Sequence, residues 1–214
     1  MDRQTTGASE PGRSERQRQA IIEAATAVFV HHGYLGATTD EVAARASVSK
    51  QTLYKHFADK RQLFAEAMLD TTLQVVDGLS KSVANTLEGV HDVRAALRDL
   101  ADGFLRTLLQ PDVLRLRRLV IAEADRFQEV GRAWFDLGFD RSLVKLGEAM
   151  RGLADRGLLH NLSDPTLAAY QFAGLVMYQP MNQAMFAGAS ALPPADKLNR
   201  IADAAVEMFL ATYG

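Results

Sequence analysis

Residues 38–60 constrain the fold of this chain more than any other stretch, because they predict two short helices joined by a tight turn and followed at once by a third helix. Thr39 is placed to cap the first helix, and acidic residues follow it in the first turn, where the helix dipole favours them. Residues 47–49 form the turn, and Ser49 can cap the second helix. Asp59 is placed to cap the third helix.

The second of these helices has one apolar and one polar face. Leu53 and Phe57 lie one turn apart and are predicted to point inward. The polar face suits the major groove of DNA, because its basic and hydrogen-bonding side chains can reach base edges or phosphates. These side chains are Lys50, Gln51, Thr52, Tyr54, Lys55 and His56. Taken alone, the same pattern also fits an ordinary solvated helix face.

This stretch resembles the helix-turn-helix of the TetR family of bacterial transcription regulators. The resemblance is carried by Thr38-Thr39, Val42-Ala43, Ala46-x-Val48-Ser49, Thr52-Leu53-Tyr54-x-His56-Phe57 and Lys60-x-x-Leu63, with Phe29 and Gly33-Tyr34 in the preceding helix. It implies double-stranded operator DNA as a partner. It also implies phosphate contacts from Thr39, Tyr54, His56 and Lys60. The base-reading positions vary among family members, so the operator sequence is not implied.

Composition excludes several other classes of protein. The chain has 214 residues, 48 % of them hydrophobic and 23 % charged, which is ordinary for a globular protein. There is no cysteine, so disulfides, thiol catalysis and cysteine-ligated metals are excluded. No apolar run reaches about 18 residues, and the N-terminus carries no apolar signal core, so we expect a cytoplasmic protein without a membrane partner.

The distribution of charge supports DNA binding only weakly. The net charge is −2, whereas residues 1–60 contain eight basic and seven acidic residues and residues 61–214 contain sixteen and nineteen. The electrostatic argument therefore depends on where individual cations lie.

The remainder of the chain predicts an all-α fold. We expect a disordered tail at 1–13, a three-helix DNA-binding domain at 14–62 and a helical-bundle domain for ligand binding and dimerisation at 63–214. A helix from Asp59 to about Val83 would be roughly 35 Å long and would link the two domains.

Apolar residues at helical spacing predict further helices beyond this link. One stripe ends before Pro111, a second helix follows it, and a single long helix is expected over about 130–156. Asp164-Pro165 is a helix start, and Pro180 should kink or end the apolar helix that follows. A last stripe follows residues 192–194.

Bulky residues in the second domain can line a pocket for a small-molecule effector, because ligand sites in helix bundles are mostly apolar with few polar groups. The preferred candidates are Phe104, Leu108, Phe127, Trp134, Phe135, Met177 and Tyr178, and the wider set adds Phe139, Met150 and Phe172. Each of them can equally be a plain core residue. Trp134 and Tyr178 are favoured because each has a polar group that can orient a ligand.

The last two helices carry more apolar surface than a monomer needs, so we expect a homodimer built on them. The predicted interface residues are Phe172, Met181, Met185, Ile201, Ala205, Met208 and Phe209. The family resemblance implies the same homodimer. The alternative is that these helices only fill the core.

No pattern for catalysis, metal or cofactor binding is present. The adjacent His31 and His32 point about 100° apart on a helix, and there is no metal-binding histidine spacing, nucleophile elbow or glycine-rich phosphate loop. We therefore expect no catalytic residues, no metal and no cofactor. Two alternatives stay open: a DNA binder or activator without a small-molecule effector, and an all-α enzyme that uses the bundle cavity.

The second domain is similar to AefR-type sensor domains in two segments, Arg117-Arg118-Leu119-Val120-x-x-Glu123 and Phe127-x-x-x-Gly131-Arg132. The two resemblances together imply a ligand-responsive homodimeric repressor. In such a protein, a ligand between the regulatory helices shifts the helix after Asp59 and changes the spacing of the two DNA-reading heads.

Overall fold

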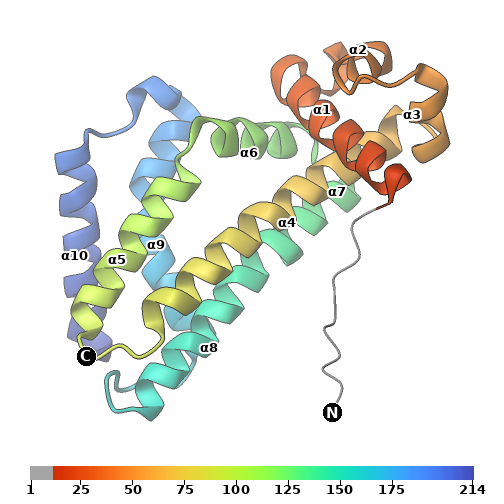
Figure 1. The fold of residues 1–214 in the computed structure, drawn as a ribbon. Coiled ribbons are helices and arrows are strands. Elements are labelled where there is room, and N and C mark those ends of the chain that lie inside the picture. Colours follow the sequence, from red (N-terminus) through yellow and green to blue (C-terminus); the bar gives the residue numbers. More distant parts are fainter. Residues whose placement is uncertain (1–11) are drawn as a thin grey trace, which may run out of the picture. The chain divides into compact units, whose positions relative to one another are not determined.

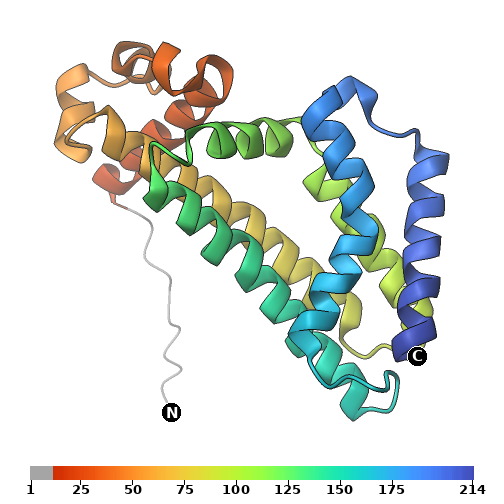
Figure 2. The same cartoon turned by 180° about the vertical axis from the view of Figure 1, so that it is seen from behind.

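The chain folds entirely into helices in a computed structural model that describes residues 12–214 (Figures 1 and 2). No strand occurs among these residues, so the predicted all-α fold is confirmed. Residues 1–11 of the expected tail lie outside the described residues. The chain divides into two compact units between Asp70 and Thr71, inside a helix, whereas the sequence placed the boundary after residue 62.

The first unit contains α1 (Arg13–Gly36), α2 (Thr39–Arg45), α3 (Lys50–His56) and the first turns of α4 (Lys60–Leu87). Its core is made by the inward faces of all four helices. The buried members include Ile21, Val28, Phe29, Val42, Leu53, Phe57, Leu63 and Phe64. Leu53 and Phe57 are fully buried, as predicted, and their burial holds α3 against the other helices.

Two of the three helix caps that the sequence predicts are present in the structure. Ser49 Oγ accepts a hydrogen bond from the Thr52 backbone N–H at 3.0 Å, and Asp59 Oδ1 accepts one from Gln62 at 2.8 Å. The expected cap by Thr39 is wrong. Thr38 has extended backbone angles and caps α2 through Oγ1, whereas Thr39 is already helical. The hydroxyl of Thr39 is thereby free for another partner.

Gly33 interrupts α1. Its φ of 70° lies in the left-handed region, which glycine adopts without strain, and one further helical turn follows to Gly36. This turn positions Tyr34, whose ring packs edge-on against Phe64 at 5.1 Å between centroids.

The second unit contains the rest of α4, α5 (Val93–Leu108), α6 (Pro111–Glu123), α7 (Gln128–Ala133), α8 (Arg141–Asp155), α9 (Pro165–Ala187) and α10 (Ala195–Tyr213). Figures 1 and 2 show α5, α9 and α10 side by side, and α8 alongside the later part of α4. The core lies between these helices, where the Phe172 ring meets those of Phe104 and Phe209 edge-on at 6.3 and 5.3 Å.

The single helix expected over 130–156 is interrupted. Residues Trp134–Asp140 form a π-helical segment between α7 and α8. A π-helix has a wider turn than an α-helix, so it changes which side chains share a face. Of the two outcomes expected at Pro180, a kink or an end of its helix, the end does not occur, since α9 continues through Pro180 to Ala187. In the described part of the chain, no helix is long and apolar enough to cross a membrane.

Close packing of α8 on α9 depends on Gly147. A Cβ atom there would lie 2.9 Å from backbone atoms of Pro165 and Thr166, whereas one at Gly152, also on α8, would meet nothing within 4 Å. We expect Gly147→Ala to lower the free energy of unfolding by about 1–3 kcal/mol, because backbone cannot move aside easily.

Gly152→Ala is the matched control. It should raise the free energy of unfolding by up to about 1 kcal/mol through helix propensity alone. Thermal and denaturant unfolding followed by circular dichroism measures both variants. Equal stability of the two would contradict the close approach at Gly147.

Candidate DNA-binding surface and ligand cavity

The outer face of α3 carries the side chains that the sequence singled out for DNA. Lys50, Gln51, Tyr54 and Lys55 are exposed, whereas Thr52 and His56 are half-buried. The Thr52 hydroxyl is already hydrogen-bonded to Ser49 Oγ at 2.9 Å. The exposed four are therefore the side chains with most freedom to reach a ligand.

Two further predicted residues flank this helix. The Thr39 hydroxyl lies 3.1 Å from the Tyr54 hydroxyl, so α2 and α3 present these two groups together. The Lys60 ammonium lies 4.6 Å from the centre of the Tyr34 ring and donates to the Leu35 carbonyl at 3.4 Å. Both Thr39 and Lys60 are half-buried. The structure thus brings all eight predicted residues onto α2, α3 and the start of α4.

Lys50 has a carboxylate partner in the free protein. Its Nζ lies 2.8 Å from Asp40 Oδ1 on α2. Hydrogen bonding to Asp40, reinforced by that residue's charge, raises the pKa of Lys50 above its ordinary value. Lys50 is therefore a protonated donor at neutral pH. A phosphate or base edge that binds Lys50 must compete with Asp40.

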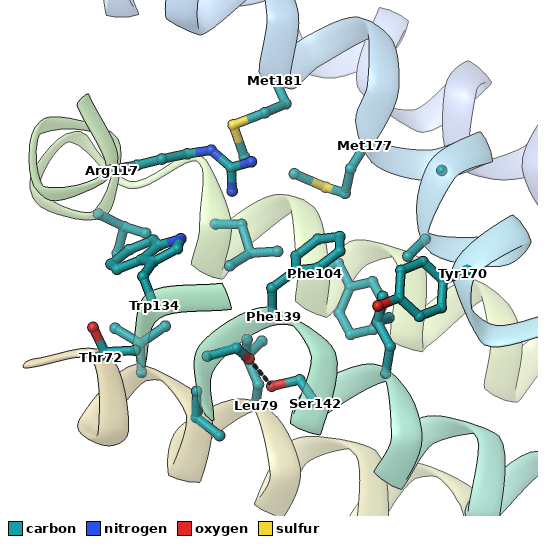
Figure 3. A pocket seen from close by; sticks show the side chains of 18 of the residues that line it. Thr72, Leu79, Phe104, Arg117, Trp134, Phe139, Ser142, Tyr170, Met177 and Met181 are labelled. Carbon is teal, nitrogen blue, oxygen red and sulfur yellow. Dashed lines mark hydrogen bonds between the residues drawn. The ribbon is translucent and has the colours of Figure 1, made fainter. Parts of the chain in front are cut away.

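The second unit encloses a cavity of about 380 Å³. It is lined by parts of α4, α5, α6, α8, α9 and the π-helical segment, and most lining side chains are apolar (Figure 3). The lining includes Thr72, Val76, Leu79, Phe104, Leu108, Val113, Arg117, Trp134, Gly138, Phe139, Ser142, Tyr170, Met177, Tyr178, Met181 and Asn182. Volume and apolar character both suit a small organic ligand.

Two hydroxyls in the lining are engaged with the protein itself. Tyr170 donates to Asp140 Oδ1 at 2.6 Å, and this hydrogen bond, with burial, raises the pKa of Tyr170 to about 12. Ser142 donates to the Gly138 carbonyl at 2.7 Å. Both hydroxyls stay protonated at neutral pH, and neither proton is free for a ligand.

Five of the seven preferred pocket residues line this cavity: Phe104, Leu108, Trp134, Met177 and Tyr178. Phe127 does not, because it is fully buried elsewhere, and Phe135 does not, because it is half exposed. The π-helical segment explains the second difference: its wide turn directs Trp134, Gly138 and Phe139 to the cavity and leaves Phe135 outside. Met150 and Phe172, from the wider set, are core residues.

Arg117 is the one charged residue in the cavity lining, and it is not among the pocket residues predicted from the sequence. It lies four residues after Val113, which is half-buried, and three before Val120, which is buried. The sequence could have identified Arg117, because it is a charged residue on the apolar face of a helix. Gly138 also contributes, because a Cβ there would lie 2.9 Å from Thr72 Cγ2. The absence of a side chain lets α4 approach the π-helical segment closely.

The predicted dimer residues fall into two groups. Phe172, Ala205 and Phe209 face the protomer core and are less than 4 % exposed, so they cannot contact a partner directly. Met181, Met185 and Ile201 are half-buried, and Met208 is 60 % exposed. Large apolar side chains that the prediction missed are more exposed still, namely Tyr178 and Phe186 on α9.

Two family profiles cover most of the described chain. "Bacterial regulatory proteins, tetR family" matches residues 21–67, and "AefR-like transcriptional repressor, C-terminal domain" matches residues 95–214. The chain belongs to the TetR family of transcriptional regulators. Both resemblances noted in the sequence are thereby confirmed, and TetR-family members are regulators rather than enzymes.

Solved structures and curated relatives agree with this assignment. A TetR-family regulator of Mesorhizobium loti is 42 % identical over 95 % of this chain and all of its own, with a TM-score of 0.91. A Pseudomonas syringae member is 28 % identical over 93 % of this chain and 97 % of its own, with a TM-score of 0.67. The transcriptional activator FasR of Mycolicibacterium smegmatis is 38 % identical over 90 residues, 42 % of this chain and 41 % of its own. The chain thus spans under half the length of the curated relatives it matches.

The Lys50–Asp40 pair predicts an effect of charge on DNA affinity. Asp40→Asn keeps the shape of the side chain but removes its charge, so it should free Lys50 for the nucleic acid. We expect a few-fold tighter binding to DNA and a steeper dependence of affinity on salt, measured by fluorescence anisotropy.

Glu41→Gln is the control for this variant. It removes one negative charge from the adjacent exposed position, where the carboxylate lies 3.0 Å from His32 Nε2 rather than near Lys50. If both variants tighten DNA binding equally, the effect belongs to net charge and not to release of Lys50.

Proposed function

We propose that this TetR-family regulator is a cytoplasmic homodimeric repressor that binds operator DNA through α3 and is released by a small molecule held in the cavity. The observation that carries the proposal is the pairing of a short, capped α3, whose exposed face is basic and hydrogen-bonding, with a mostly apolar cavity in the second unit.

Coupling between cavity and DNA goes through α4. Thr72, Val76 and Leu79 of this helix line the cavity, and Leu63 and Phe64 of the same helix are buried in the DNA-reading unit. A ligand that displaces α4 therefore acts on the element to which α3 is packed. It changes occupancy only by preferring one arrangement over the other, by a few kcal/mol for a strong switch.

Whether the protein represses or activates transcription is a separate part of the proposal. The profile that matches residues 95–214 is named for a repressor, and so is a Streptomyces coelicolor relative, 40 % identical over 65 residues, whereas FasR is named an activator. We therefore favour a repressor, and an activator is the second candidate.

Selection of bound fragments from genomic DNA tests the DNA-binding role. Gln51→Ala and Lys55→Ala should relax the enriched sequence, because both side chains are exposed on α3. Lys60→Ala should instead weaken binding to all sequences and lower the salt slope by about one, because Lys60 begins a helix rather than facing the groove.

The orientation of α3 would be disproved if Lys60→Ala changed base preference while Lys55→Ala had no effect. The position of the enriched site decides the direction of regulation. Transcription from a promoter carrying that site should rise when the protein is removed if it is a repressor, and fall if it is an activator.

Met208 tests the homodimer, since TetR-family regulators act as dimers. In the single protomer Met208 is exposed, so Met208→Glu should leave the fold intact. In an interface formed by α9 and α10, the new charge would be buried without a partner and should dissociate the dimer. Light scattering measures the mass, and Met208→Leu should remain dimeric. A dimeric, folded Met208→Glu variant would place the interface elsewhere.

A further inference from the structure

One charged side chain enters an otherwise apolar cavity. Arg117 extends from α6, and its guanidinium points into the space near Met177 and Met181 (Figure 3). No other lysine or arginine, and no aspartate or glutamate, belongs to the cavity lining. Asp140, which follows the lining residue Phe139 in the chain, accepts a hydrogen bond from the Tyr170 hydroxyl.

Arg117 has no hydrogen-bond or ion-pair partner among the described residues, in contrast to three other arginines of the second unit. Its neighbour Arg118 donates to the Ala184 carbonyl, Arg115 pairs with Asp112, and Arg94 pairs with Glu207. Burial lowers the pKa of Arg117, but a guanidinium stays protonated at any physiological pH. The cavity therefore holds a permanent cation that lacks an anion.

A partly buried, unpaired cation costs free energy that an anionic ligand would recover. A guanidinium presents donors in a planar fork that matches the two oxygens of a carboxylate. The Trp134 indole N–H, which also lines the cavity, has no acceptor among the described residues and supplies a further donor. The rest of the lining, including Phe104, Phe139 and the two methionines, suits an apolar body.

We propose that the cavity binds amphipathic carboxylic acids, with the ligand carboxylate on Arg117 and its apolar body among the aromatic and methionine side chains. This inference rests on the proposed ligand response and gives it a chemical class. A single guanidinium balances a single negative charge, which favours a monocarboxylate over a phosphate ester with about two charges.

Matched acid and amide pairs test the proposal, because each pair differs in the charge of the head group and little in shape. The probes are 3-phenylpropanoate with 3-phenylpropanamide, and decanoate with decanamide, so the arms also separate an aromatic from an aliphatic body. Trp134 is the only tryptophan of the chain and lines the cavity, so its fluorescence reports occupancy directly. Calorimetry of the full-length protein checks the affinities.

At least one acid should bind the wild-type protein at least about tenfold more tightly than its amide, the range expected for a charge-assisted hydrogen bond. Arg117→Met should abolish that preference and leave the affinity for the amide unchanged, which also shows that the cavity is intact. Arg117→Lys should keep part of the preference. Arg115→Met, on the exposed side of the same helix, should behave as wild type.

Equal binding of acid and amide, an unchanged preference in Arg117→Met, or no binding of either acid overturns the proposal. Two further results distinguish failure of the proposed ligand class from failure of the proposed function. If the amides bind and release operator DNA as well as the acids do, the ligand response stands and the carboxylate class is wrong. If an acid binds through Arg117 but operator affinity does not change, the ligand class stands and the regulatory response is wrong.

Discussion

The shared use of α4 is the constraint on which the rest of this structure depends. Leu63 and Phe64 belong to the core around α3, whereas Leu79 and Val83 belong to the core of the second unit. Asp70 and Thr71 are consecutive residues of one continuous helix, so α4 supplies core residues to both units. A regulator needs such an element, because coupling requires a part whose position both sites bias.

The DNA-reading half was predictable because its determinants are local. Ser49 and Asp59 cap helices that begin at the next residue, and Leu53 and Phe57 are neighbours on one helix face. The one error, Thr39 in place of Thr38, follows from two adjacent threonines with equal capping ability. In the structure Thr38 caps α2, and the hydroxyl of Thr39 lies beside that of Tyr54.

The cavity was predictable only in part, because distant segments build it. A helical stripe identifies residues that are buried, such as Phe104 and Phe172, but not which of them face empty space. The π-helical segment places Phe139 in the cavity lining and leaves Phe135 outside it. The spacing of an α-helix does not predict this wider turn. The same limit applies to the predicted dimer residues: an apolar helix has buried positions on several sides, and the adjacent Phe209 and Met208 are 1 % and 60 % exposed.

Specificity in such a cavity comes from its few polar groups rather than from its apolar volume. An apolar wall distinguishes ligands weakly, since one methylene changes affinity by only about 1–3 kcal/mol. A buried group that must be paired discriminates far more strongly, because a ligand without the matching group leaves it desolvated and unsatisfied. Arg117 is the residue of this kind in the cavity lining, and it stands on the short α6 rather than on α4. In the proposed ligand complex, substitution at Arg117 would therefore change ligand choice without altering a residue of α3 or α4.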